Sequence, residues 1–343
     1  MLAFGQPAPY FIASTASSPE FVFDTAGGRY VLMLFLPTDA AAQPALQAMA
    51  ANQRLFDDVK ATAFVVLRQP GQVQGARDLR GLRWIHDKSG TISDHYGPEP
   101  HWLLLDPTLR TMGTWPIEAA AEVFARVTAL PSPAEHAGVP LHAPVLIAPN
   151  IFEPELCRAL IALHQESGGE PTGVMRDVGD RTVAVMDKLK RRRDIWVQDP
   201  ELIEAMRLRL ERRLYPMIQM ALGFAVTHIE RFLVSCYDSE DGGVFHAHRD
   251  NNTHGTAHRK FACSLNLNDD FEGGDLRFPE FGPQTYRPPP GGAAVFSCGL
   301  MHEATRITRG RRYAFLPFFY DAAGAEVLAA YQARIAAAEK ATA

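Results

Sequence analysis

Hydrophobic and polar positions along the first third of the chain alternate between two patterns. Residues 30–36 (YVLMLFL) and 62–67 (TAFVVL) are continuous apolar runs of strand length, which are typical of strands buried on both faces of a sheet. Between them, residues 46–59 show helical spacing of apolar side chains. The order strand, helix, strand predicts a parallel crossover and hence a small α/β sandwich. Its remaining elements are expected to be strands at 82–85 and 101–105 and a helix at 117–127.

The second half of the chain begins with helical spacing and then changes to short strands. One helix is expected to start within residues 150–156, with Pro154 early in its first turn. Another is expected to start at Asp199–Pro200, a cap followed by a proline at the first helical position. Pro216 is expected to kink or end that second helix. Beyond Gly223, turns rich in glycine and proline separate short apolar runs, which predicts a β-sandwich or barrel such as a jelly roll. Its strands are expected at 230–236, 261–267, 275–278, 293–298 and 312–319.

A proline-rich stretch divides these two patterns. Four prolines fall within residues 131–145, and they bias the chain toward extended conformations. A length of 343 residues also favours two domains. The sequence therefore predicts an α+β protein in four parts, namely a domain at 1–130, a linker at 131–145, a second domain at 146–322 with its β core at about 225–322, and an alanine-rich helix at 323–343.

Composition and charge exclude several classes of protein. Hydrophobic residues make up 47% and charged residues 21% of the chain, as in ordinary globular proteins, which argues against global disorder. The net charge of −5 provides no basic field for nucleic acid. The N-terminus lacks the features of a signal peptide, and the longest apolar run, 30–37, is far shorter than the ~20 residues of a membrane span. We therefore expect a cytoplasmic protein, with a homodimer left open.

Cysteines and a basic run add little chemistry of their own. Four cysteines, all in the second half, form no CxxC pair, and this favours reduced thiols over a disulfide framework. Three of them fall on expected strands, where small core residues are the simpler interpretation than a redox set (Cys236, Cys263 and Cys298). The run KLKRRR at 188–193 is interpreted as a solvated face rather than an anion site.

A histidine and an aspartate two residues apart are the first candidate for chemistry. His248 and Asp250 follow an expected strand, so that their side chains share one face. His302, just beyond a later strand, is the candidate third ligand. Two histidines and one carboxylate leave open positions on Fe(II) for a chelating cosubstrate and O2. A His-x-Asp pair alone is more typical of a surface turn, and His246 offers a competing His-x-His pair.

A later arginine changes that balance. Arg312 lies ten residues after His302 and follows a turn signal at Gly310, so a hairpin would return it toward the metal. The guanidinium fork suits a carboxylate, and it could hold the far end of a dicarboxylate whose near end chelates iron.

Together with their surroundings, these residues resemble the 2-oxoglutarate- and Fe(II)-dependent dioxygenases, in particular the prolyl 4-hydroxylase-like branch. Residues 264–278 (SLNLNDDFEGGDLRF) and 288–296 (PPPGGAAVF) are similar to the segments of that branch before the distal histidine. The resemblance spans roughly 147–321. It implies a double-stranded β-helix, or jelly roll, with flanking helices, in which iron is held by the triad and the distal carboxylate of 2-oxoglutarate by Arg312. Tyr237 looks like the tyrosine that hydrogen-bonds the same carboxylate, and a core tyrosine is the alternative.

The resemblance also implies an activity. Enzymes of this family use Fe(II), 2-oxoglutarate and O2, with ascorbate as a possible reductant, and hydroxylate an unactivated C–H. The substrate would be a protein, a peptide or a small molecule, with a prolyl residue as one option. Arg249, Asn251 and Arg259 lie in or beside a polar stretch at 251–260, and they are expected on the substrate side, with ordinary loop solvation as the alternative. A non-enzymatic sensor or scaffold that binds iron and 2-oxoglutarate stays open.

The N-terminal region has a resemblance of its own. Residues 5–40 resemble the opening of a peroxiredoxin, a thioredoxin-fold family, in which a proline, a threonine or serine and the peroxidatic cysteine form the catalytic loop. Here Pro37 is present, but the next two positions align with Ala41 and Pro44, and no cysteine precedes Cys157. Peroxide reduction requires a low-pKa thiolate. We therefore expect a thioredoxin-like domain without redox activity, and a thioredoxin-fold redox protein is the less favoured alternative.

Overall fold

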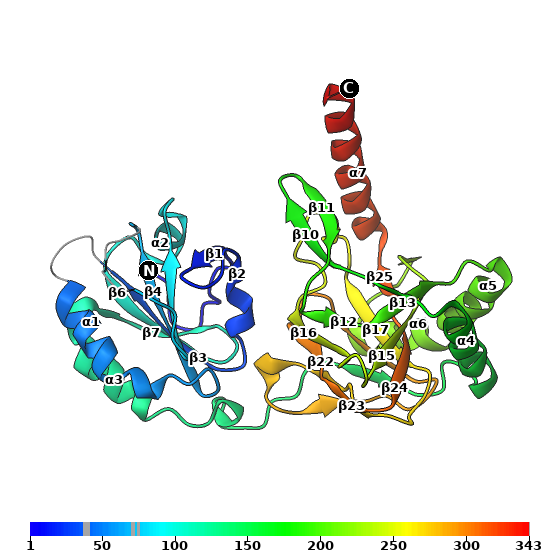
Figure 1. Ribbon diagram of the computed structural model, residues 1–343, viewed down its shortest axis with the longest axis horizontal. Helices are drawn as coiled ribbons and strands as arrows, with labels where there is room; N and C mark the ends of the chain where they lie inside the picture. The colour runs from blue at the N-terminus through cyan, green and yellow to red at the C-terminus, as the bar shows by residue number, and fades with distance from the viewer. Residues whose placement is uncertain (37–41, 70–72, 74–75, 343) are drawn as a thin grey trace. The chain divides into compact units, whose positions relative to one another are not determined.

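The computed structural model describes residues 1–36, 42–69, 73 and 76–342 (Figure 1). The chain divides into two compact units, of which the first comprises Met1–His142 with Phe278–Gln284 and the second Ala143–Arg277 with Thr285–Ala343. The division at 142/143 lies within the expected linker at 131–145, whereas the membership of 278–284 in the first unit was not expected. No helix among the described residues has the length and apolar character needed to cross a bilayer.

A seven-stranded mixed sheet forms the centre of the first unit, in the order β2-β1-β5-β4-β3-β6-β7. The pairs β3–β4 and β4–β5 are parallel, as the expected crossover requires, and β6 and β7 add in antiparallel fashion. The strands are β1 Ile12–Thr15, β2 Phe21–Val22, β3 Tyr30–Phe35, β4 Ala61–Leu67, β5 Leu82–His86, β6 His101–Leu105 and β7 Thr111–Pro116.

Helices cover both faces of this sheet, which explains the continuous apolar runs. Leu32 on β3 packs in a cluster with Met49 of α1 (Ala42–Ala51) and Val123 of α3 (Ala120–Thr128). The next residue, Met33, packs in a different cluster with Ile92 of α2 (Thr91–Tyr96). Successive side chains of a strand point to opposite faces, so both faces of β3 are buried.

The expected helix at 46–59 is wrong at both of its ends. The observed α1 begins at Ala42 and ends at Ala51, and a short 3-10 turn follows at Gln53–Leu55. Asp57 then accepts hydrogen bonds from the backbone N–H groups of the next residues, and this turn chemistry competes with helix continuation. Of the positions aligned with the peroxiredoxin loop, Pro44 lies in α1, whereas Pro37 and Ala41 lie outside the described residues.

The segment 278–284 packs within the first unit through close backbone approach. Glu280 is buried there, at 7% exposure. Gly28, with φ +87°, lies so near this segment that a Cβ on it would be 2.7 Å from the carbonyl oxygen of Pro279. Only glycine fits such a position without displacement of its neighbour.

Antiparallel sheets build the second unit, as expected for a jelly roll. A nine-stranded sheet runs β14-β25-β17-β24-β15-β13-β9, with β21 paired to β17 and β8 paired to β21, and a five-stranded sheet runs β12-β16-β22-β19-β20. Their strands are β8 Leu146–Ala148, β9 Glu170–Pro171, β12 Lys190–Arg191, β13 Arg193–Trp196, β14 His228–Ile229, β15 Leu233–Asp238, β16 Val244–His248, β17 Phe261–Asn266, β19 Leu276–Arg277, β20 Thr285–Tyr286, β21 Ala293–Ser297, β22 His302–Ala304, β24 Arg311–Phe315 and β25 Phe318–Tyr320.

Three helices pack against the larger sheet, and prolines interrupt one helical stretch and one strand. The helices are α4 (Pro154–Ser167), α5 (Pro200–Arg209) and α6 (Tyr215–Leu222), and their buried residues form one cluster with those of β15, β17 and β24. Pro216 interrupts but does not end the second helical stretch, because a π turn immediately before α6 accommodates the proline. The expected strand at 312–319 is divided into β24 and β25 on either side of Pro317.

Two small features complete the second unit. Two two-stranded sheets outside the large sheets were not expected, the hairpin β10–β11 (Val174–Val178 and Arg181–Val185) and the long-range pair β18–β23 (Glu272–Gly273 and Ile307–Arg309). The C-terminal helix α7 spans Ala322–Thr342 (Figure 1). All four cysteines are buried and free, as expected of reduced core thiols.

Candidate metal centre

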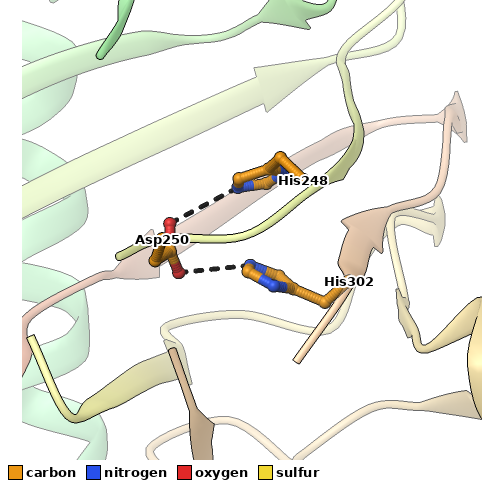
Figure 2. A group of neighbouring side chains, drawn as sticks. All are labelled: His248, Asp250 and His302. Carbon is orange, nitrogen blue, oxygen red and sulfur yellow. Dashed lines mark ion pairs between the residues drawn. The ribbon is translucent and has the colours of Figure 1, made fainter. Parts of the chain in front are cut away.

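Two neighbouring strands of the five-stranded sheet bring the triad together. His248 is the last residue of β16 and pairs in register with His302, the first residue of β22. Asp250 follows two residues after the strand end. Figure 2 shows its carboxylate between the two imidazoles, with Oδ1 at 3.5 Å from Nε2 of His248 and Oδ2 at 3.3 Å from Nε2 of His302. The three ligand atoms lie within 4.8 Å of one another, close enough to share one metal ion.

A β-bulge selects which histidine of the His-Ala-His segment points into the site. The pairing of β16 with β22 shifts register between Phe245 and His248, so that these two side chains lie on one side of the strand. Their rings stack, with centroids 3.6 Å apart. His246 is exposed and uses its backbone N–H to bond Leu189. The competing His-x-His pair is therefore wrong.

Backbone carbonyl groups fix the orientation of both imidazoles. Nδ1 of His248 lies 2.7 Å from the carbonyl oxygen of His246, and Nδ1 of His302 lies 3.0 Å from that of Leu300. A carbonyl oxygen only accepts hydrogen bonds, so Nδ1 must carry the proton in each ring. In the neutral imidazole the lone pair is then on Nε2, the atom that faces Asp250, and this is the tautomer that a metal requires.

The charge states of the triad suit metal binding. Burial and the neighbouring His302 lower the pKa of His248, which favours the neutral ring. Burial acts to raise the pKa of Asp250, but the two imidazoles outweigh it and hold this pKa well below its ordinary value. A neutral imidazole beside an ionised carboxylate is the donor set of a divalent transition metal.

The triad and Arg312 line one pocket. Arg312 is only 2% exposed, and its guanidinium donates to Asn266 Oδ1 at 2.9 Å and Ser264 Oγ at 2.6 Å. Both acceptors are uncharged, and among the described residues Arg312 forms no ion pair. Tyr237, its register partner on β15, is buried with its ring 5.4 Å from the guanidinium carbon. The Arg312 guanidinium is therefore a buried cation without a counter-ion, and an anion bound beside it would be stabilising.

Two of the five basic residues in the run 188–193 do not belong to the solvated face that was expected. Lys190 and Arg192 point inward, while Lys188, Arg191 and Arg193 are exposed. The alternation of extended backbone along β12 and β13 separates the two sets. The sequence did carry a signal for this, because every second residue of KLKRRRD from Lys190 onward points inward. The many charged residues in the run made this alternation hard to recognise.

Arg192 reaches the pocket from this run, and its charge is already balanced. Its Nε lies 2.9 Å from Oδ1 of Asp194, and Nη1 donates to the Tyr237 hydroxyl at 3.0 Å. Burial opposes ionisation of Asp194, but Arg192 and Lys190 outweigh it and hold the pKa of Asp194 well below its ordinary value. Burial and the Arg192 cation lower the pKa of Lys190 to about 7. Arg192 therefore orients Tyr237 as one half of a buried ion pair.

The three residues expected on the substrate side have different surroundings. Arg249 is half-buried and donates to the carbonyl of Gly299, and Asn251 is half-buried beside it in sequence. Arg259 is 7% exposed and makes a two-point ion pair with Glu230, so ordinary loop solvation is wrong for this residue. Its Nη1 also donates to the backbone oxygen of Asp250, which ties it to the triad.

Comparison with known proteins assigns the segment that carries these residues. A family model of the 2OG-Fe(II) oxygenase superfamily matches residues 232–320. No protein with curated annotation matches the chain. Structural neighbours include a prolyl hydroxylase from Trichoplax adhaerens in complex with a hypoxia inducible factor oxygen degradation domain peptide fragment, with 18% identity, 54% of this chain and 86% of that chain covered, and a TM-score of 0.43.

Two further neighbours are a prolyl-4-hydroxylase from Pseudomonas putida and a 2OG-Fe(II) oxygenase family oxidoreductase from Burkholderia pseudomallei. The first has 19% identity over 52% of this chain and 92% of that chain, with a TM-score of 0.38. The second has 18% identity over 51% and 84%, with a TM-score of 0.37. The matched segment of this chain is a 2OG-Fe(II) oxygenase domain, of a family that uses Fe(II), 2-oxoglutarate and O2.

Proposed function

We propose that the chain is an Fe(II)- and 2-oxoglutarate-dependent hydroxylase of an unactivated C–H. The observation that carries this proposal is the coincidence, in one pocket, of a preoriented His248–Asp250–His302 triad and an unpaired guanidinium at Arg312. A divalent metal fits the triad, because both Nε2 atoms and one carboxylate face a common point. An anion fits beside Arg312, because burial without a counter-charge is unfavourable for a cation.

Arg312 and Tyr237 would hold the cosubstrate. The guanidinium pairs with the distal carboxylate of 2-oxoglutarate, and Ser264 and Asn266 fix its orientation from behind. Tyr237 receives a hydrogen bond from Arg192 on its hydroxyl oxygen, so its own proton is free to be donated to the same carboxylate. A charge-assisted contact of this kind is stronger than one between neutral groups.

Fe(II) with 2-oxoglutarate and O2 would supply the oxidising equivalents for hydroxylation. The protein contributes position and a dry environment. Phe245 covers one face of the His248 ring, and Phe296 lies 4.6 Å from the His302 ring, so apolar side chains keep water from the imidazoles. The resemblance of 264–296 to the prolyl 4-hydroxylase-like branch makes a prolyl C–H in a peptide or protein the first substrate to test.

The first unit we propose to be thioredoxin-like and without redox activity. Parallel β3, β4 and β5 followed by antiparallel β6 and β7, with helices on both faces, support the thioredoxin-like assignment. Residues 1–142 contain no cysteine, and thiol chemistry has no other nucleophile. A peroxide-consumption assay of the metal-free protein tests this, since robust consumption would contradict it.

Anaerobic titration with Fe(II) and 2-oxoglutarate tests the proposed site without knowledge of the substrate. We expect a visible charge-transfer band of the chelate that is absent in His248→Ala and that requires more 2-oxoglutarate in Arg312→Ala. Arg158→Ala, an exposed change on α4, is the matched control and should leave the band unchanged. A wild-type protein that binds 2-oxoglutarate at this site but forms no succinate with any substrate would favour the sensor or scaffold instead. No band in the wild type would contradict the proposal.

A further inference from the structure

A second unpaired cation lines the same pocket. Arg231 lies two residues before β15, which begins at Leu233. It was not singled out in the sequence, yet it lines the pocket together with Arg312 and Asp250. Its Nε donates to the carbonyl oxygen of Leu316 at 2.9 Å. This is its only hydrogen bond among the described residues, and the two terminal NH₂ groups form no ion pair there.

Neighbouring arginines differ from Arg231 in having a carboxylate partner. Arg259 stacks on the same Phe318 ring as Arg231, at 4.0 Å against 4.2 Å from the ring centroid. Arg259 is neutralised by two contacts with Glu230 at 2.6 Å, just as Arg192 is neutralised by Asp194. Arg231 has no such carboxylate, and burial and its cationic neighbours lower its pKa to about 10.

Two anionic groups are then needed to balance the unpaired arginines of the pocket. Of the arginines that line it, Arg192 is paired, while Arg231 and Arg312 are not. Under the proposed function, one carboxylate of 2-oxoglutarate pairs with Arg312, and the other end of the molecule chelates the metal, whose positive charge Asp250 also partly neutralises. No group in that arrangement neutralises Arg231. A guanidinium without a counter-ion inside a pocket is unfavourable until a ligand supplies one.

We propose that Arg231 is a specificity-determining residue that binds a carboxylate of the substrate. This inference rests on the proposed function and names the substrate class for the same site. The two terminal NH₂ groups of Arg231 match the two oxygens of one carboxylate, because Nε is already used by Leu316. A single guanidinium balances the one charge of a carboxylate, whereas a phosphate monoester carries nearly two. Phe318, stacked on the guanidinium, holds its plane in place.

Matched acids and amides test the proposal with a binding readout that needs no turnover. The full-length chain is loaded anaerobically with Mn(II), which does not turn over, and with saturating 2-oxoglutarate. Acetate against acetamide, N-acetylglycine against its amide, and proline against prolinamide are then titrated by calorimetry. We expect each acid to bind at least about tenfold more tightly than its amide, as expected of a charge-assisted hydrogen-bond pair.

Three arginine variants show whether Arg231 is responsible for that preference. In Arg231→Met the acids should lose about 10- to 100-fold in affinity, while the affinity for 2-oxoglutarate changes by less than about threefold. Arg158→Met on α4 is the control and should change neither. Arg259→Met should unfold at lower urea concentration because it removes the arginine that pairs with Glu230, whereas Arg231→Met breaks no ion pair and should not.

Each contrary result has a separate meaning. Equal affinity for acids and amides, with normal 2-oxoglutarate binding, would overturn the substrate assignment and leave the proposed function intact. A loss of 2-oxoglutarate affinity in Arg231→Met as large as that in Arg312→Met would overturn it by giving Arg231 to the cosubstrate. Absence of 2-oxoglutarate binding in the wild type would remove the proposed function, and this inference with it.

Discussion

Replacement of Glu230 by glutamine tests the electrostatics behind the triad. Glu230 accepts hydrogen bonds from Arg259 through both carboxylate oxygens and lies 3.0 Å from Nε2 of His258. Both partners are buried, and Arg259 continues to the backbone oxygen of Asp250. Glutamine keeps the size of the side chain and one acceptor oxygen but removes the negative charge, so the ion pair is lost with little change in packing.

The magnitude follows from the pKa of this carboxyl. Burial acts to raise it, but His258 and Arg259 together hold it at about 2, against an ordinary value of 4.5. A depressed carboxyl pKa stabilises the folded state above pH 4.5, and this contribution is lost as pH falls toward 2. The difference of about 2.5 pKa units corresponds to about 3 kcal/mol, of which about 2 kcal/mol would be lost by pH 3.

Hydrogen exchange in peptides from β17 and β25, measured for wild type and Glu230→Gln between pH 3 and pH 7, reads the local free energy of opening. We expect the wild type to be more stable at pH 7 by about 3 kcal/mol, and this difference to shrink to about 1 kcal/mol at pH 3. The comparison cancels other acidic groups that titrate in the same range. A difference that stays constant from pH 7 to pH 3 would refute the reasoning, because it would mean that the carboxylate charge contributes nothing.

Three other changes probe the second unit. Arg192→Met leaves Asp194 buried without its principal cation and should cost about 3–5 kcal/mol in urea unfolding, and a loss below 1 kcal/mol would contradict the buried ion pair. Gly274→Ala, at a position with φ +71°, adds a Cβ that would lie 2.2 Å from Cδ1 of Ile307 and 3.2 Å from Cδ of Arg312, so 2-oxoglutarate should bind at least about tenfold more weakly by titration. Phe319→Ala removes a fully buried ring from the main core and should lower stability by about 3–5 kcal/mol in the same urea assay, with unchanged stability as the contrary result.

Local patterns in the sequence predicted much of this fold, while long-range pairing determined the rest. The run at 30–36 is a strand because both of its faces are apolar, and that property is visible in the residues themselves. The end of α1 at Ala51 depends on a turn made by Asp57, and the apolar spacing beyond it carries no sign of this. Strands of two residues, such as β12, exist only because a partner strand pairs with them.

The candidate site divides in the same way. His248, Asp250 and His302 were found from spacing, and the structure brings them together. Rejection of His246 required the bulge in β16, which arises from the pairing with β22 and cannot be seen in one strand alone. Arg231 was missed because its distinguishing property is the absence of a counter-charge, and the sequence places Glu230 directly beside it.

The segment 278–284 has a consequence for how this protein can be divided. The chain passes from the first unit to the second after His142. The segment 278–284, between β19 and β20, belongs to the first unit again, although these two paired strands are part of the sheet that carries the triad. A fragment that begins at Ala143 would keep this segment but lose Gly28 and the other residues that bury Glu280. The two units therefore cannot be separated by a single cut in the chain. A fragment cut at the proline-rich linker would therefore carry the loop 278–284 without the residues that it packs against.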